Sequence, residues 1–114
     1  MLASGLVSGP AVKLSIYLSD GAKHHGIPVY TSLLDFFFKN GVYGATVFKG
    51  VAGFGSTHRI HSAHILEISD HLPIKIEIFE TREKIEALLP EIEKRTGSGI
   101  IEIQDTTVRI PVRQ

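Results

Sequence analysis

The chain has 114 residues, 43% of them hydrophobic, which is the length and composition of one compact domain. Lysine plus arginine equals aspartate plus glutamate, at 12 each, so no overall charge attracts nucleic acid or an anionic membrane. The absence of cysteine excludes disulfides, thiolate metal sites and cysteine nucleophiles. No apolar run approaches the ~20 residues that span a bilayer, so we expect a cytoplasmic protein that is not inserted in a membrane.

The chain is expected to begin with a loose leader over residues 1–11, followed by one domain over residues 12–114. Glycine, serine and proline interrupt the leader, which lacks the charged start and apolar run of a signal peptide. The segment "VKLSIYL", from Val12 to Leu18, then alternates apolar and polar residues. This period of two predicts a first strand with one buried face.

A first helix is predicted from Pro28 to Lys39. Proline suits the start of a helix, and Gly41 supplies the usual left-handed stop. Leu33 and Phe37 belong to a wide apolar stripe at spacings of three and four residues. The stripe indicates a helix that packs on a sheet.

The stretch "GATVFKGVAGFG", from Gly44 to Gly55, combines apolar residues with four glycines. Its β-branched and aromatic content is typical of a buried strand. The glycines would let backbone N–H groups approach a bound anion closely. The polar continuation "STHRIHSAH" therefore indicates either a flexible anion-binding loop or a plain long connection to the next strand.

The second half of the chain predicts a strand, a helix and two further strands. "PIKIEIF", from Pro73 to Phe79, alternates strictly, and Thr81 is placed to cap the helix "REKIEALLPEIEKR". Pro90 should kink or restart that helix, because it removes a hydrogen bond and clashes with the preceding turn. "IIEIQ" then predicts strand four, and "TVRIPV", with Pro111, predicts a short additional edge strand.

The order of these elements predicts an α+β fold of the ferredoxin-like βαββαβ type, with the extra C-terminal edge strand. One antiparallel sheet would carry both helices on one face. Nothing in the chain would cover the other face, which favours a homo-oligomer.

The histidines of the loop raise the question of a metal site. His58, His61 and His64 form H-x-x-H-x-x-H, and imidazole is a common zinc ligand. On a strand His61 would face away from the other two, and six residues are not a whole number of helical turns. Solvated loop histidines or anion ligands are favoured over a metal site within one chain. His24 and His25 are interpreted as exposed turn residues.

The sequence gives little support for an enzyme. No serine lies in a strand-turn-helix nucleophile elbow, and no pair of carboxylates is placed for general acid–base catalysis. Arg109 and Arg113 lie four apart on the predicted last strand and project to the same side, where arginine can hold phosphate oxygens. Exposed sheet-edge charges are an equally good interpretation of the two arginines.

Four segments resemble a known family: "LSIYLSD", "HGIPVYTSLLDFFFKNGVYGATVFKGVAGFG", "THRIHSAHILEISDHLPIKIEIFET" and "GSGIIEIQDTTVRI". They are similar to the small PII-like family catalogued as domain of unknown function one-ninety. The most specific motif, G-x-x-G-A-T-V-x-K/R-G-x-x-G-F-G, is met by Gly41 to Gly55. The resemblance covers about Val12 to Val112.

The resemblance implies a homotrimer related to PII signalling proteins and to CutA. In PII proteins an adenine nucleotide lies between neighbouring subunits, and a loop between strands two and three reports its presence to a partner. Here the implied function is non-enzymatic, with no required cofactor and with a membrane transporter or an enzyme as target. The ligand-binding residues expected are Lys49, Gly50, Gly53, Phe54, Gly55, His58, Arg59, His61, Gly97, Gly99, Arg109 and Arg113.

One difference qualifies what the resemblance implies. The turn "RTGSG" is similar to the phosphate-holding turn of PII proteins, but it is shorter and lacks that turn's lysine. This difference counts against high affinity for a triphosphate and leaves a monophosphate, cyclic or otherwise smaller adenylate among the candidate ligands, without deciding between them. The alternative is a CutA-like trimer that binds a divalent metal through His58, His61 or His64 of different subunits.

Overall fold

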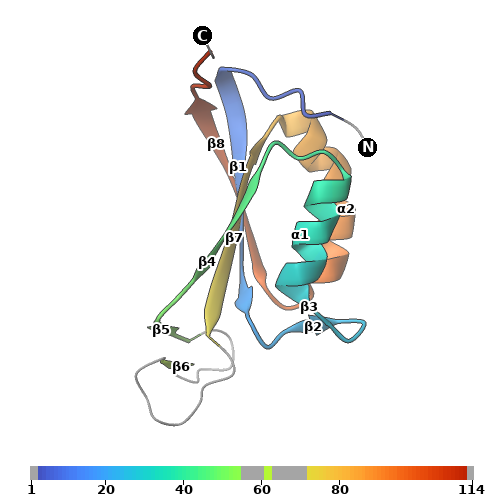
Figure 1. The fold of residues 1–114 in the computed structure, drawn as a ribbon, viewed down its shortest axis with the longest axis vertical. Helices are drawn as coiled ribbons and strands as arrows, with labels where there is room; N and C mark the ends of the chain where they lie inside the picture. Colours follow the sequence, from blue (N-terminus) through green and yellow to red (C-terminus); the bar gives the residue numbers. More distant parts are fainter. Residues whose placement is uncertain (1–2, 55–60, 63–71, 113–114) are drawn as a thin grey trace.

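The computed structural model describes residues 3–54, 61–62 and 72–112. In these residues a four-stranded antiparallel sheet, in the order β4-β7-β1-β8, carries α1 and α2 on one face (Figure 1). The elements are β1 (Gly9–Ser19), β2 (Lys23–His24), β3 (Ile27–Pro28), α1 (Val29–Lys39), β4 (Ala45–Lys49), β5 (Ala52–Gly53), β6 (His61–Ser62), β7 (Pro73–Glu80), α2 (Arg82–Thr96) and β8 (Ile100–Val108). The predicted ferredoxin-like α+β fold is confirmed. Neither helix of the described residues is long and apolar enough to cross a membrane.

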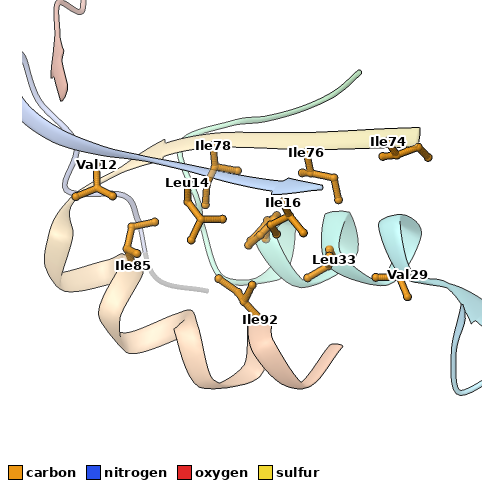
Figure 2. Close-up of a cluster of buried hydrophobic side chains, with 11 residues drawn as sticks. Val12, Leu14, Ile16, Val29, Leu33, Ile74, Ile76, Ile78, Ile85 and Ile92 are labelled. Carbon is orange, nitrogen blue, oxygen red and sulfur yellow. The ribbon is translucent and has the colours of Figure 1, made fainter. Parts of the chain in front are cut away.

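The core lies between the helices and one face of the two central strands. Leu14 and Ile16 of β1 pair with Ile78 and Ile76 of β7, and all four are at most 1% exposed. Their side chains point toward the helices (Figure 2). The helices contribute Val29, Leu33, Phe37, Ile85 and Ile92 to the same cluster. Burial of each such side chain contributes about 1.5–3 kcal/mol to the free energy of unfolding. This layer is therefore the main source of stability.

β1 begins three residues before the predicted start, at Gly9 instead of Val12. The described residues of the expected leader also contact the domain. Leu6 is 8% exposed, and the Ser4 hydroxyl donates a hydrogen bond of 2.6 Å to Glu80. Ser4 and Leu6 of the expected leader are therefore held against the domain.

α1 follows the prediction closely. Pro28 is the residue before the first helical residue, with φ −52° and ψ 133°, so its missing N–H costs no helical hydrogen bond. Gly41 has φ +65°, the left-handed conformation expected after the helix. Before α1 the chain makes the small hairpin β2–β3, in which His25 and Gly26 have positive φ. His25 is an exposed turn residue as predicted, whereas His24 lies in β2 and is half-buried.

α2 is one helix through Pro90, and the predicted restart there is wrong. Ile85 and Ile92 lie on either side of the proline and are at most 1% exposed. Their burial against the sheet holds the helix together across the lost hydrogen bond. Pro90 itself is exposed, so its ring does not disturb the packed face.

β4 is far less buried than its composition predicts. It forms an edge of the sheet and pairs only with β7. Only Val47 packs against the core, and Phe48 is 49% exposed. The prediction of a buried strand is wrong because an edge strand has one neighbour, and because Phe48 lies on the face without helices.

The C-terminal edge is one long strand instead of two short ones. The predicted fourth and last strands are joined in β8, which pairs with β1 from Gly9↔Val108 to Tyr17↔Ile100. The expected separate strand with Pro111 is not formed, because Asp105 and Thr106 continue the pairing without a turn. After Val108 the chain is held by the Ser8 hydroxyl, which accepts a bond of 2.7 Å from the Ile110 N–H.

Glu80 joins three segments at the end of β7. Its side chain is 0% exposed, and one carboxylate oxygen accepts bonds from the Ser4 hydroxyl at 2.6 Å and the Tyr43 N–H at 2.9 Å. The other oxygen accepts a bond of 2.9 Å from the N–H of Thr81, the residue that caps α2 as predicted. The buried carboxylate therefore ties the N-terminal segment and the α1–β4 connection to the start of α2.

Substitution of this carboxylate should destabilise the domain strongly. We expect Glu80→Gln to lower the free energy of unfolding by about 2–3 kcal/mol, because an amide N–H₂ would face donors that now share a charged acceptor. Glu86→Gln, on the exposed side of α2, is the matched control and should cost less than about 0.5 kcal/mol. Urea denaturation of both variants measures the difference, and equal midpoints would contradict the role assigned to Glu80.

Candidate functional site

The two ends of the long connection after β4 are held together. β4 ends at Lys49, and the Gly50 N–H donates a hydrogen bond of 2.7 Å to the carbonyl oxygen of Pro73, the first residue of β7. A second small ladder follows, in which Gly53 of β5 pairs with His61 of β6. This root of the connection lies at the lower end of the sheet in Figure 1.

The glycines at the root serve close packing. A Cβ on Gly50 would lie 2.6 Å from the Cγ of Pro73, and a Cβ on Gly53 would lie 3.2 Å from the same atom. The Gly50 N–H is also engaged with the Pro73 carbonyl. Its backbone donor is therefore not available to an anion, and at Gly50 the chain makes a close contact where a flexible anion-binding loop was one of the two predictions.

Lys49 is held by a residue that the sequence analysis did not select. Its Nζ lies 3.2 Å from Oδ2 of Asp20, just beyond the end of β1. The Lys49 side chain is 58% exposed, whereas that of Asp20 is 13% exposed. The Asp20 N–H donates to the Leu72 carbonyl at 3.0 Å, so the acidic partner is fixed and the ammonium faces solvent.

The turn after α2 is built around its own hydrogen bonds. Gly97 has φ +68°, and its N–H donates to the Glu93 carbonyl at 3.2 Å. The buried Thr96 hydroxyl donates to the Ile92 carbonyl at 2.7 Å. A Cβ on Gly99 would lie 2.6 Å from the Tyr17 carbonyl oxygen. These glycines therefore allow the turn and its close approach to β1, and the Gly97 N–H is engaged.

The structure brings some of the predicted residues to one end of the sheet. Lys49 pairs with Ile74 of β7, and Ile74 pairs with Leu18 near the end of β1. The Gly99 turn approaches the neighbouring residue Tyr17. The loop root and the glycine turn thus share an end of the sheet.

Arg109 lies at the other end. It directly follows Val108, which pairs with Gly9 at the start of β1. Leu18 lies nine residues after Gly9 in β1, which is ~30 Å at the rise of a strand. Arg109 and Lys49 of the same chain therefore lie far apart. The prediction that Arg109 projects from a last strand is wrong, because β8 ends one residue earlier, at Val108.

Several predicted residues lie outside the described part of the chain: Gly55, His58, Arg59, His64 and Arg113. The backbone of His61 is described in β6. Phe54 is 64% exposed. In the described ranges no group of three histidine, aspartate or glutamate side chains is arranged to hold a metal ion.

A row of side chains crosses the face of the sheet that carries no helix. Phe48, Lys75, Tyr17 and Ile100 are successive partners across the four strands. The Lys75 ammonium lies 5.7 Å from the Tyr17 ring centre and 5.8 Å from that of Phe48. Its hydrogen bond with Glu77 raises the pKa of Lys75. The row, here called the aromatic row, leaves Ile100 68% exposed at one end and Phe48 49% exposed at the other.

Comparison with known proteins identifies related chains. The family profile DUF190, described as "Uncharacterized ACR", matches residues 11–108. A UPF0166 protein of Aquifex aeolicus is 36% identical over 83% of this chain and 90% of its own length. One of Methanocaldococcus jannaschii is 34% identical over 83% of this chain and 88% of its own.

Solved structures share the fold. CPII from Thiomonas intermedia K12, a nitrogen regulatory PII-like protein bound to ADP, AMP and bicarbonate, aligns with a TM-score of 0.63 and 24% identity. That alignment covers 90% of this chain and 97% of CPII. A structure of CPII bound to ADP and bicarbonate aligns with a TM-score of 0.56 and 26% identity, over 90% and 91% of the two chains.

The close contact at the loop root is testable. Gly50→Ala should lower the free energy of unfolding by about 1–3 kcal/mol, because the added methyl overlaps the rigid ring of Pro73. Gly44→Ala is the control, since a Cβ there meets nothing within 4 Å. Chemical denaturation compares the two variants. If they are equally stable, Gly50 is not selected for packing on Pro73.

Proposed function

The chain belongs to the DUF190 family, and from that membership and its PII-like fold we propose a non-enzymatic regulatory protein that binds an adenine nucleotide or a similar small anion. The observation that carries the proposal is the ammonium of Lys49. It is 58% exposed at the root of the β4–β7 connection, on a fold whose relatives have been seen with ADP, AMP and bicarbonate. Phosphate and carboxylate groups are the natural partners of such a cation.

The proposed ligand site lies between subunits of a homotrimer. In one chain Arg109 is ~30 Å along the sheet from the loop root, so a shared site would require Arg109 from a neighbour. The face without helices is the surface proposed for assembly. Its aromatic row ends at Ile100, which is 68% exposed and apolar, and burial of such side chains favours association.

Signalling is proposed to pass through the connection between β4 and β7. A ligand that binds one arrangement of this segment better than another shifts their populations by its difference in affinity. A membrane transporter or an enzyme would then recognise the favoured arrangement. The cradle proposed for the ligand comprises Lys49, Gly53, Phe54 and Gly99, with the loop residues His58, Arg59 and His61.

The alternative function is that of a CutA-like trimer that binds a divalent metal through His58, His61 or His64. These histidines would come from different subunits, where the objection from their spacing along one chain does not apply. The PII-like relatives bound to nucleotide favour the first function over this one.

Nucleotide binding is the first test. An adenine nucleotide at 100 times its dissociation constant should stabilise the protein by about 2.7 kcal/mol per site, which raises the unfolding midpoint by several degrees in a domain of this size. Thermal unfolding with AMP, ADP and ATP measures this shift, and the nucleotides should be recovered unchanged by chromatography. A shift with zinc or copper alone would favour the metal-binding alternative, and no shift with any of them would refute both.

The contribution of Arg109 is tested with the same assay. Arg109→Ala should weaken nucleotide binding about tenfold, as expected for one lost charge-assisted contact, and leave the oligomer intact. Lys39→Ala is the control, because Lys39 forms an exposed pair with Asp35 on α1. Unchanged affinity of the Arg109 variant would remove this residue from the site.

Assembly through the face without helices gives a further prediction. In dilute solution the wild-type protein should sediment with three times the mass of one chain. Ile100→Glu should dissociate the trimer, since it places a charge on the apolar end of the aromatic row. Phe38→Glu, at a residue 74% exposed on α1, should leave it intact. Analytical ultracentrifugation compares the three proteins, and the reverse result would place the interface on α1.

A further inference from the structure

Asp20 and Lys49 form an ion pair whose two side chains differ in solvent exposure. The Asp20 carboxylate is 13% exposed, and its backbone N–H is fixed to the Leu72 carbonyl at 3.0 Å. The Lys49 side chain is 58% exposed at the end of an edge strand. A ligand can therefore reach the ammonium from solvent, whereas the carboxylate stays behind it.

The carboxylate is only partly satisfied. Oδ2 lies 3.2 Å from the Lys49 Nζ, while Oδ1 is buried and has no hydrogen-bond partner among the described residues. An ammonium has three donors, so Lys49 can contact Asp20 and a ligand anion at the same time. The Lys49 ammonium would then lie between the ligand anion and the fixed Asp20 carboxylate.

The repulsion in that arrangement grows with the charge of the ligand. The neighbouring turn offers no compensation, because residues 97–99 are Gly-Ser-Gly. Arg95, just before the turn, is already engaged: its Nε donates to Glu91 at 2.7 Å and its Nη1 to the Ser32 hydroxyl at 3.0 Å. This turn therefore adds no cation to Lys49, and a lysine backed by a carboxylate favours an anion of lower charge than a lysine without one would.

We propose that Asp20 sets the charge preference of the anion site at Lys49, favouring a phosphomonoester over a triphosphate. This proposal rests on the proposed function of the site and adds a specificity-determining residue to it. Asp20 does not touch the ligand; it acts through Lys49, which it holds and partly neutralises.

The experiment measures dissociation constants of AMP and ATP, without magnesium and at matched ionic strength, by calorimetry. The proteins are the wild type, Asp20→Asn and the control Asp35→Asn, which removes the acidic member of an exposed pair on α1. Wild-type protein should bind AMP at least as tightly as ATP. Asp20→Asn should raise the affinity for ATP relative to AMP about tenfold, which corresponds to about 1.4 kcal/mol, and Asp35→Asn should leave the ratio unchanged.

The possible outcomes test the role of Asp20 separately from nucleotide binding. An unchanged ratio in Asp20→Asn, or wild-type affinity that rises steeply from AMP to ATP, overturns the role of Asp20 while nucleotide binding stands. If no nucleotide binds to the wild type, the proposed function fails, and inorganic phosphate and tripolyphosphate are compared on the same proteins by thermal unfolding. The inference is supported if Asp20→Asn increases the stabilisation by tripolyphosphate more than the stabilisation by phosphate, each relative to the wild type. Equal increases for the two anions overturn it.

A merely structural role for Asp20 is tested in the Lys49→Met background. There Asp20→Asn should no longer change the ATP to AMP ratio, because the carboxylate acts through the ammonium. A change that persists without Lys49 would overturn the proposed route. The wild-type affinity series needs no variant, so the proposal can be refuted even if Asp20→Asn does not fold.

Discussion

The ladder between β1 and β7 is the constraint on which the other elements depend. Side chains alternate along both strands, and the register places the apolar half of each on the same face. That face has to be covered, and α1 and α2 cover it. The remaining half, with Lys75, Glu77 and Tyr17, is left on the opposite face. The central pair also leaves β4 and β8 as edges, so the long connection begins on a strand with only one neighbour.

Much of this fold could be predicted because its signals are local. The alternation of β1 and β7, the stripe of α1, the left-handed Gly41 and the cap by Thr81 each depend on residues close in sequence. Burial is different, since it depends on the neighbours that the topology supplies. Phe48 is of a residue type usually found in the core, yet it lies on an uncovered face. Glu80 is of a type usually found at the surface, yet it is buried. The continuity of β8 and of α2 is likewise decided by tertiary packing.

The sequence could predict that Lys49 and the glycines follow one strand, but it could not predict the contacts that they make. The motif identified Lys49 and the glycines at the end of β4, and the structure places them at one root. The sequence could not show that Gly50 is required by Pro73, 23 residues later, or that Asp20, 29 residues earlier, holds Lys49. Both partners are brought there by the pairing of three strands. Arg109 lies far from Lys49 within one chain for the same reason, because antiparallel pairing sends the end of β8 to the opposite end of the sheet.

The bond between Gly50 and Pro73 also bears on how this domain can change over time. It closes the intervening connection at its base, so the sheet, and not the connection itself, fixes the distance between the two ends. For any flexible insertion closed in this way, doubling its length costs only about 0.6 kcal/mol of chain entropy. Insertions between Gly53 and His61 would lie outside the ladder between β1 and β7. The domain can therefore acquire segments of new length and composition, and with them new partners, at little thermodynamic cost.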